Sequence, residues 1–293
     1  MIDLSGKTAF ITGGASGIGL AMAHAFGAAG MNVMLADIEE APLAAAVSAL
    51  EERQVQAAGL ICDVTDRAAL KAAAEKTVAT FGKVHLVCNN AGVGAGGPID
   101  QVRPADWDWV IQVNLMGVIY GLEAFLPHLR AHGDGGHVVN TASMAGMISP
   151  PGMEPYCATK FAVVAMSEGW AGQLAADNIG VSVLCPGFVR TNIDKSTRNR
   201  PDRFGGPEAS EGITTSGLVQ AGIDPERVAL RVLEAVRANQ LYIFTHPNMR
   251  VTVQDRFARI MQGFDQADAS PALEGLESPA LPNLTGGAGR AAD

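Results

Sequence analysis

The sequence predicts an α/β fold: one doubly wound, parallel sheet of seven strands with helices on both faces. Short apolar runs rich in β-branched residues alternate along the chain with alanine-rich helical stretches. Runs that are apolar throughout are typical of strands buried on both faces, and β-α-β alternation is typical of a parallel sheet. Of 293 residues, 48% are hydrophobic and 17% charged, which is enough for one large core.

The elements follow one another without an obvious break. Helical patterns such as "GLAMAHAFGAAG" and "APLAAAVSALEER" separate the apolar runs, and we expect about six helices. No Pro/Gly-rich linker divides residues 1–262, which are therefore predicted to form a single domain. The seven strands are expected at 8–12, 32–37, 59–64, 85–92, 136–143, 181–187 and 241–246.

Two segments depart from this alternation. Residues 195–217, "KSTRNRPDRFGGPEASEGITTSG", are polar and rich in Gly and Pro, and we interpret about 188–217 as a lid. Its cations Lys195, Arg198, Arg200 and Arg203 are expected to be solvated, with binding of an anionic substrate as the alternative. Residues 263–293 are small and Pro-rich, and are expected to form a C-terminal extension lying on the surface or on a partner subunit, or to be disordered.

Composition excludes several classes of protein. A formal net charge of −9 argues against a nucleic-acid binder, which needs basic surface. No apolar run is expected to reach the length of a membrane span, and the N-terminal residues lack the pattern of a secretory signal. The four cysteines lie far apart, so neither a metal site nor a disulfide is expected. These features predict a soluble, cytoplasmic protein.

A glycine-rich turn follows the first predicted strand and opens a helix, in the stretch "TAFITGGASGIGLAMAHAF". Gly13, Gly17 and Gly19 have G-x3-G-x-G spacing, which lets a pyrophosphate approach the amides at a helix N-terminus. An ordinary Gly-rich turn is the alternative. The position of the motif between strand and helix favours a dinucleotide site.

An acidic residue, Asp37, ends the second predicted strand. Its carboxylate can accept the ribose hydroxyls of adenosine and repels a 2′-phosphate. Ser16, rather than Arg or Lys, precedes Gly17, and no arginine follows Asp37. The sequence therefore predicts NAD as the cofactor. Asp37 could also cap the following helix.

A tyrosine and a lysine, Tyr156 and Lys160, stand one helical turn apart in "PYCATK". On a helix they share a face, where a phenol and an ammonium change each other's acidity. Such pairs are usually solvated surface residues, so the spacing alone is weak evidence for catalysis.

Several motifs occur in one order: "TGGASGIG" at 12–19, "NNAG" at 89–92, Asn114, Ser143, Tyr156, Lys160 and "PG" at 186–187. In this the chain resembles the short-chain dehydrogenase/reductase family in its single-domain form, over about residues 5–250. The resemblance implies a Rossmann fold, an NAD(P)-dependent alcohol/ketone oxidoreductase, and a tetramer or dimer. The length of the chain is similar to that of a longer-tailed subset that includes bacterial dehydrogenases of benzylic alcohols from aryl ethers.

The resemblance also implies roles for particular side chains. Tyr156 would be the general acid/base, and Lys160 would lower its pKa and bind the nicotinamide ribose. Ser143 would hold the substrate oxygen. Asn114 lies in "DWDWVIQVNLMGVIYGLEAF" at 106–125, which is expected to be one helix. It would hold a water in a proton relay, although a satisfied buried amide is the alternative. The predicted cofactor-binding residues are Gly13, Ser16, Gly17, Ile18, Gly19, Asp37, Asp63, Val64, Asn90, Ala91, Gly92, Tyr156, Lys160, Pro186, Gly187, Val189 and Thr191. Asp63 and Val64 are expected to end the third strand and flank the adenine.

The substrate is less well indicated. Methionines are unbranched and adaptable, so those after Ser143 suit an apolar or aromatic substrate. Packing of the core is the alternative. The predicted substrate-binding residues are Ser143, Met144, Met147, Met153, Tyr156 and Phe188.

These features predict an NAD-dependent dehydrogenase of a hydrophobic secondary alcohol. The rival from another class is a catalytically silent NAD-sensing module of the same fold, which would have no need to keep Tyr156. A sugar-nucleotide epimerase or dehydratase is a third hypothesis, but the glycine spacing and larger C-terminal domain of that branch are not seen in this sequence.

Overall fold

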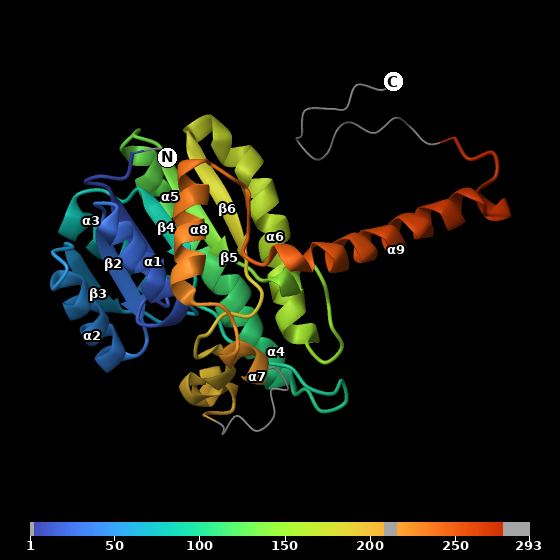
Figure 1. Ribbon diagram of the computed structural model, residues 1–293, viewed down its shortest axis with the longest axis horizontal. Coiled ribbons are helices and arrows are strands. Elements are labelled where there is room, and N and C mark those ends of the chain that lie inside the picture. Colours follow the sequence, from blue (N-terminus) through green and yellow to red (C-terminus); the bar gives the residue numbers. More distant parts are fainter. Residues whose placement is uncertain (1–2, 208–215, 278–293) are drawn as a thin grey trace. The chain divides into compact units, whose positions relative to one another are not determined.

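A computed structural model describes residues 3–207 and 216–277. Seven strands form one parallel sheet in the order β3-β2-β1-β4-β5-β6-β7 (Figure 1), which confirms the predicted fold class. The strands are β1 (Thr8–Thr12), β2 (Asn32–Asp37), β3 (Ala57–Ile61), β4 (Leu86–Asn89), β5 (Gly136–Thr141), β6 (Ile179–Cys185) and β7 (Tyr242–Phe244).

Helices cover both faces of this sheet. The α-helices are α1 (Gly17–Ala28), α2 (Glu40–Glu51), α3 (Arg67–Phe81), α4 (Pro104–Ile111), α5 (Gly117–Ala131), α6 (Glu154–Leu174), α7 (Ser216–Gln220), α8 (Pro225–Arg237) and α9 (Arg250–Asp268). The expectation of about six is therefore too low for the described residues. One reason is that the helix predicted around Asn114 is interrupted by a π-helical turn, η1 (Gln112–Met116), between α4 and α5.

The core has two layers, one on each face of the sheet. Successive strand residues point to opposite faces. Ile11 therefore lies in the cluster that contains α1, α2 and α8, whereas Phe10 lies in the cluster with α3, α5 and α6. Both side chains are fully buried, and each such burial contributes about 1.5–3 kcal/mol. This explains why the strands are apolar throughout.

The order of the strands reverses between β1 and β4. The chain runs outward through β2 and β3 on one side, and through β5, β6 and β7 on the other. In open α/β sheets, ligands bind at the carboxyl ends of the strands beside such a switch point. Most of the residues predicted to bind a cofactor lie at or just after the ends of β1, β2, β3, β4 and β6, which places them at this edge.

One strand ends earlier than predicted. Asp63 and Val64 were expected to end the third strand, but β3 stops at Ile61. The side chain of Asp63 accepts two hydrogen bonds from Thr65, one from the backbone N–H at 2.9 Å and one from the Thr65 hydroxyl at 2.7 Å. This local turn competes with continuation of the strand.

The helical run Pro104–Ala131 is long and apolar enough to cross a membrane, so the expectation that no segment reaches that length is wrong. Half of its most apolar window is buried inside the protein. Val110, Phe125 and Leu129 lie in this run and are almost completely buried. Burial of this kind is typical of a core helix, which passes the same test of length and composition.

The chain divides into two compact units, Met1–Pro247 and Asn248–Asp293. The first contains the sheet, and the second contains α9 and the short turn η7 (Pro271–Leu273). The division predicted after residue 262 falls inside α9 and stays a prediction. Residues 208–215 of the predicted lid and 278–293 of the predicted extension lie outside the described residues.

Candidate active site

Tyr156 and Lys160 lie on consecutive turns of α6. Lys160 Nζ is 5.5 Å from the centroid of the Tyr156 ring, and the lysine is only 2% exposed. The ammonium donates a hydrogen bond of 2.8 Å to the backbone oxygen of Thr141, at the end of β5. The lysine is therefore held inside the protein rather than solvated on its surface, and Tyr156 beside it is only partly exposed.

Burial dominates the acidity of both groups. It raises the pKa of Tyr156 to about 12, against a smaller lowering by a hydrogen bond from Ser143. It also lowers the pKa of Lys160 to about 8. In the protein without cofactor, the Tyr156 phenol is thus harder to ionise than a free tyrosine. The resemblance implies the opposite direction, a pKa lowered by Lys160. The lowering by Lys160 stays a prediction for the complex with an oxidised cofactor.

Ser143 joins this pair from the end of β5. It is the N-cap of a short 3₁₀ turn, η2 (Met144–Gly146), and its Oγ accepts the N–H of Ala145 at 3.1 Å. The hydroxyl donates to the backbone oxygen of Pro186 at 3.4 Å. Met144 N–H donates to the same oxygen at 2.8 Å, so the segment after β5 is fastened to the segment after β6.

Asn114 is fully buried in the π-helical turn η1. Its Oδ1 accepts the N–H of Val93 at 2.8 Å, and its Nδ2 donates to Val93 O at 2.9 Å and to Thr159 Oγ1 at 3.4 Å. A Cβ built on Gly92 would lie 3.4 Å from Asn114 Oδ1 and 3.6 Å from Lys160 Nζ, so the three residues meet. The amide is satisfied, and the relay role stays a prediction.

The glycine-rich turn has the geometry that the motif predicts. Gly13 and Gly17 adopt φ of +63° and +54°, which disfavours residues with a Cβ. A Cβ on Gly19 would lie 2.0 Å from Gly13 O, and one on Gly17 would lie 3.0 Å from Thr191 Cγ2. Ser16 is the N-cap of α1, but its side chain makes no hydrogen bond to the helix. The turn therefore presents the N-terminal amides of α1.

Asp37 holds the end of β2 beside this turn. Its Oδ2 accepts the N–H of Ala15 at 3.0 Å, while Oδ1 accepts those of Ile38 at 2.7 Å and Glu39 at 3.1 Å. The N-cap of α2 is Glu39, so Asp37 is not the cap of that helix. A carboxylate has about four acceptor positions, so capacity remains for a hydroxyl donor.

Two threonines that sequence analysis missed connect the strand ends. Thr12 Oγ1 accepts the N–H groups of Asn90 at 2.9 Å and Ala91 at 3.0 Å. Asn90 Nδ2 donates to Thr12 O at 3.0 Å, and Thr141 Oγ1 donates to Asn90 Oδ1 at 3.2 Å. Thr12 ends a predicted strand and Thr141 lies two residues before the end of another, and that position was the signal available in the sequence.

His246 is a third residue that was missed. Its Nδ1 accepts the N–H of Gly187 at 3.1 Å, so the neutral ring carries its proton on Nε2. Nε2 lies 3.2 Å from Phe188 O, to which it can donate. The imidazole thus fastens the backbone of the turn after β6 at two points, next to Pro186. Val189, further along this segment, is buried and forms a β-bridge with Ile223.

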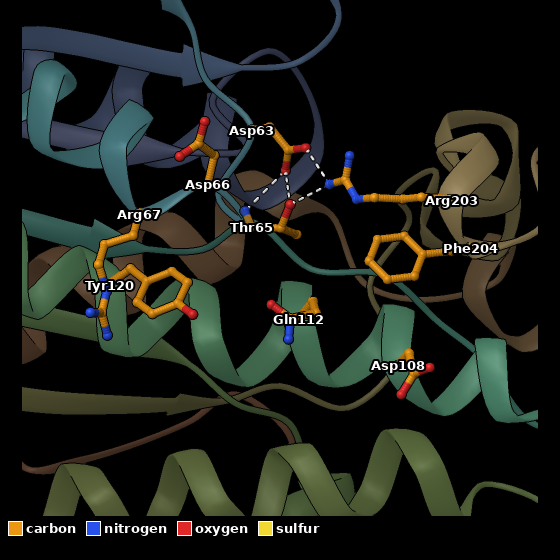
Figure 2. A pocket seen from close by; sticks show the side chains of 9 residues that line it. All are labelled: Asp63, Thr65, Asp66, Arg67, Asp108, Gln112, Tyr120, Arg203 and Phe204. Carbon is orange, nitrogen blue, oxygen red and sulfur yellow. Dashed lines mark hydrogen bonds and ion pairs between the residues drawn. The ribbon is translucent and has the colours of Figure 1, made fainter.

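An open pocket of about 680 Å³ lies beside the end of β3 (Figure 2). Arg203 donates to Asp63 at 2.9 Å across its mouth. Burial raises the pKa of Asp63, but hydrogen bonds from Thr65 and Arg203 outweigh it and leave the pKa below its usual value. Only Asp63 among the predicted site residues lines the pocket, whereas Val64 is buried. The lining residues are Asp63, Thr65, Asp66, Arg67, Asp108, Gln112, Tyr120, Arg203 and Phe204.

The described part of the lid is tied to three other segments. Arg198 pairs with Glu39 after β2 at 2.6 Å, and Arg203 pairs with Asp63 after β3. Arg200 pairs with Asp106 of α4 at 2.5 Å and is only 3% exposed. The expectation of solvated lid cations is therefore wrong for Arg200, whose guanidinium lies over the ring of Trp109.

The predicted substrate residues differ in exposure. Met144 and Met147 are buried, at 4% and 9% exposed, so both contribute to packing. Met153 is partly exposed and Phe188 is 37% exposed. Contact with a substrate stays a prediction for all of them.

One group of side chains outside the predicted site resembles a metal centre: His85, His132 and Asp134. Lys83 Nζ donates to Asp134 Oδ2 at 2.6 Å. His85 Nδ1 accepts the N–H of Thr8 at 3.1 Å, so its neutral ring carries a proton on Nε2, the nitrogen that faces Asp134. That nitrogen has no lone pair for a metal ion, and the group is better described as an ion-pair cluster.

A parallel sheet with a glycine turn at its switch point, and a tyrosine beside a buried lysine, are typical of a dinucleotide-binding protein of the oxidoreductase class. The family model for short chain dehydrogenases matches residues 7–202, and the chain belongs to this family. It is therefore an oxidoreductase of the short-chain dehydrogenase/reductase type.

Relatives agree with this assignment. The chain is 36% identical to the C alpha-dehydrogenase of Sphingobium sp. (strain NBRC 103272 / SYK-6), over 92% of this chain and 90% of the relative. It is 34% identical to 3beta-hydroxysteroid dehydrogenase 2 of Eggerthella lenta, over 77% and 86%. A short chain dehydrogenase/reductase from Burkholderia phymatum, solved in complex with NAD, has a TM-score of 0.85 and 38% identity, covering 90% of this chain and 97% of that one.

Proposed function

We propose that the protein is an NAD-dependent dehydrogenase that interconverts a secondary alcohol and a ketone on a hydrophobic or aromatic small molecule. The observation that carries the proposal is the buried Lys160 beside Tyr156, with Ser143 close enough to the phenol to lower its pKa. The rival, a silent NAD-sensing module, has no need for this arrangement. The proposal assigns catalysis to residues 1–262.

The residues around the glycine turn fit a dinucleotide. The positive φ at Gly13 and Gly17 and the lack of space at Gly19 keep the turn close to the N-terminus of α1. This supports binding of a pyrophosphate at the helix amides. Asp37, with a free acceptor position, would hold the adenosine ribose. The carboxylates of Asp37 and Glu39 repel a 2′-phosphate. The nearby cation Arg198, which could otherwise attract that phosphate, is already paired with Glu39.

When bound, NAD supplies the acceptor for the hydride that leaves the alcohol carbon. Tyr156 would take the hydroxyl proton in the same reaction, and Ser143 would hold the substrate oxygen next to it. Burial opposes the phenolate, so the charge of Lys160 is needed to stabilise it. Lys160 would also hold the nicotinamide ribose, and Asn114 a water that returns the proton to solvent.

The substrate class is supported by the partly exposed Met153 and Phe188 near the segments after β5 and β6. Apolar, adaptable side chains suit a hydrophobic ring better than a charged group. The names of the relatives from Sphingobium and Eggerthella lenta are consistent with such substrates. We also expect a soluble cytoplasmic homo-oligomer, either a tetramer or a dimer.

The test is a panel of benzylic and alicyclic secondary alcohols with NAD or NADP, followed by absorbance at 340 nm. We expect reduction of NAD by at least one hydrophobic alcohol and little reduction of NADP. Equal use of the two cofactors would show that Asp37 does not select between them. No turnover across the panel, with NAD binding intact, would favour the NAD-sensing module.

A further inference from the structure

Helix α9 has an apolar stripe along its length. It runs for 19 residues from Arg250 to Asp268, and none of its residues is buried. The stripe recurs at intervals of three and four positions, the spacing of one helix face. Phe257, Met261 and Phe264 are 53%, 57% and 63% exposed. The stripe consists of Val253, Phe257, Ile260, Met261 and Phe264.

The two ends of α9 carry charges on the same line as this stripe. Arg250 is the first and Asp268 the last of the 19 residues, so five turns of about 3.6 residues separate them and they project alike. Each charge is the wrong one for its position, because a helix N-terminus favours anions and a C-terminus favours cations. A lone helix gains nothing from this arrangement.

We propose that α9 pairs antiparallel with the α9 of a second copy of the chain. In that pairing Arg250 of each copy lies beside Asp268 of the other, and Val253 lies beside Phe264. Phe257 packs against Ile260 and Met261 at the centre. The same helix face serves both copies, as a two-fold symmetric contact requires. Each misplaced end charge also meets its opposite.

The apolar face and end charges of α9 are self-complementary, which favours a second copy of the chain as its partner. The helix has three arginines and three aspartates, so it lacks the strongly basic face with which interfacial helices bind anionic membranes. The 19 residues of α9 extend over only about 28 Å. One such helix pair is therefore too small to supply the whole of a stable interface, which buries roughly 1,200–2,000 Å². The α9 pair therefore adds to the contact between copies and does not form it alone.

Cross-linking of the full-length protein tests the geometry. All four native cysteines are buried, so introduced cysteines dominate the reaction with a short bis-maleimide. An equimolar mixture of Arg250→Cys and Asp268→Cys proteins should give several-fold more cross-linked dimer than either variant alone. Gln262→Cys, on the opposite side of the helix, is the matched control. The proposal fails if the mixture cross-links no better than either variant alone or than this control.

A charge exchange tests the energetics by sedimentation equilibrium. Arg250→Asp and Asp268→Arg should each weaken the self-association constant by about three- to tenfold, since two surface ion pairs are replaced by repulsions. The double variant Arg250→Asp/Asp268→Arg should restore it. Arg250→Asp improves the match to the helix dipole, so loss of the helix does not explain weaker association. Unchanged association in both single variants would overturn the proposal, and neither test depends on the proposed enzymatic function.

Discussion

The ammonium of Lys160 donates to the backbone oxygen of Thr141 and has almost no contact with solvent. A buried charge of this kind costs the folded state free energy unless the group loses its proton. The pKa of Lys160 is accordingly lowered to about 8 from an ordinary 10.5. Its cost to folding is therefore greatest below pH 8, where the group is charged in both the folded and the unfolded states.

The free energy of unfolding should therefore rise with pH relative to a Lys160→Met variant. The folded pKa lies below the unfolded one, so the stabilising contribution is present above pH 10.5 and is lost as the pH falls through 8. Between pH 7 and pH 10, the free energy of unfolding of the wild type should rise by roughly 2–3 kcal/mol relative to that of the variant. Urea unfolding measures this, with Lys71→Met on the exposed side of α3 as the control. A difference independent of pH would mean that the ammonium is not buried.

His246→Phe should weaken NAD binding by about tenfold. The substitution keeps a ring of similar size but removes the hydrogen bonds to Gly187 and Phe188, each worth about 0.5–1.5 kcal/mol. The turn after β6 is then no longer held in place. Titration with NAD gives the dissociation constant, and thermal unfolding shows whether the fold survives. His128→Phe, on α5, is the matched control, and equal affinities for NAD in wild type and His246→Phe would contradict this role.

Spacing in the sequence was sufficient to bring Tyr156 and Lys160 together, because one helical turn separates them. Spacing does not show how deeply such a pair lies, and burial is what raises the pKa of Tyr156 and lowers that of Lys160 in the protein alone. His246 and Thr12 were missed for a related reason. Their partners are backbone groups in the segments that follow distant strands, and such groups have no signature in the sequence.

At the scale of elements, the lid is held by ion pairs of very different burial. The Arg200 side chain is 2% exposed and its partner Asp106 is 15% exposed. Burial raises the pKa of Asp106, yet hydrogen bonds from Arg103 and Arg200 leave it at about 2. Arg203 and Asp63 are 55% and 38% exposed. A buried pair that loses one partner costs about 3–5 kcal/mol, whereas a surface pair contributes about 0–1 kcal/mol.

Arg200→Met should therefore loosen the lid much more than Arg203→Met. Amide hydrogen exchange over 193–207 should accelerate by a hundredfold or more in the first variant, and by less than about tenfold in the second. Adding NAD and a turned-over alcohol should slow exchange in the wild type if the lid closes over ligands. Equal exchange in the two variants would show that Arg200 does not anchor this segment.

The helix around Asn114 is the element that differs most clearly from its prediction. A continuous helix around Asn114 was expected from its apolar pattern, but η1 interrupts it. A π-helical turn adds a residue without changing polarity, so hydrophobic periodicity does not detect it. Here the interruption carries Asn114, whose side chain binds the backbone of Val93 after β4.

At the scale of the whole molecule, topology brings the site together. Residues after β1, β2, β4, β5 and β6 meet at one edge because all seven strands are parallel and their order reverses between β1 and β4. This much could be predicted, since alternation of apolar runs and helical stretches specifies the fold class. A helix-like stretch beyond "YIFTHPNMR" could also be recognised, but the same pattern did not predict that α9 belongs to a separate compact unit. None of the residues of α9 is buried in the described structure. No strand follows α9 in the described residues, so the β-α alternation does not show where the domain ends.

The central claim is that Tyr156 transfers the proton during NAD-dependent oxidation of an alcohol. It is tested most directly by Tyr156→Phe, which removes the hydroxyl and keeps the ring. The account predicts that kcat falls by about 10²–10⁴-fold, the usual contribution of a general acid/base, while the dissociation constant for NAD changes by less than about threefold. A variant that keeps kcat within about threefold of wild type would contradict it.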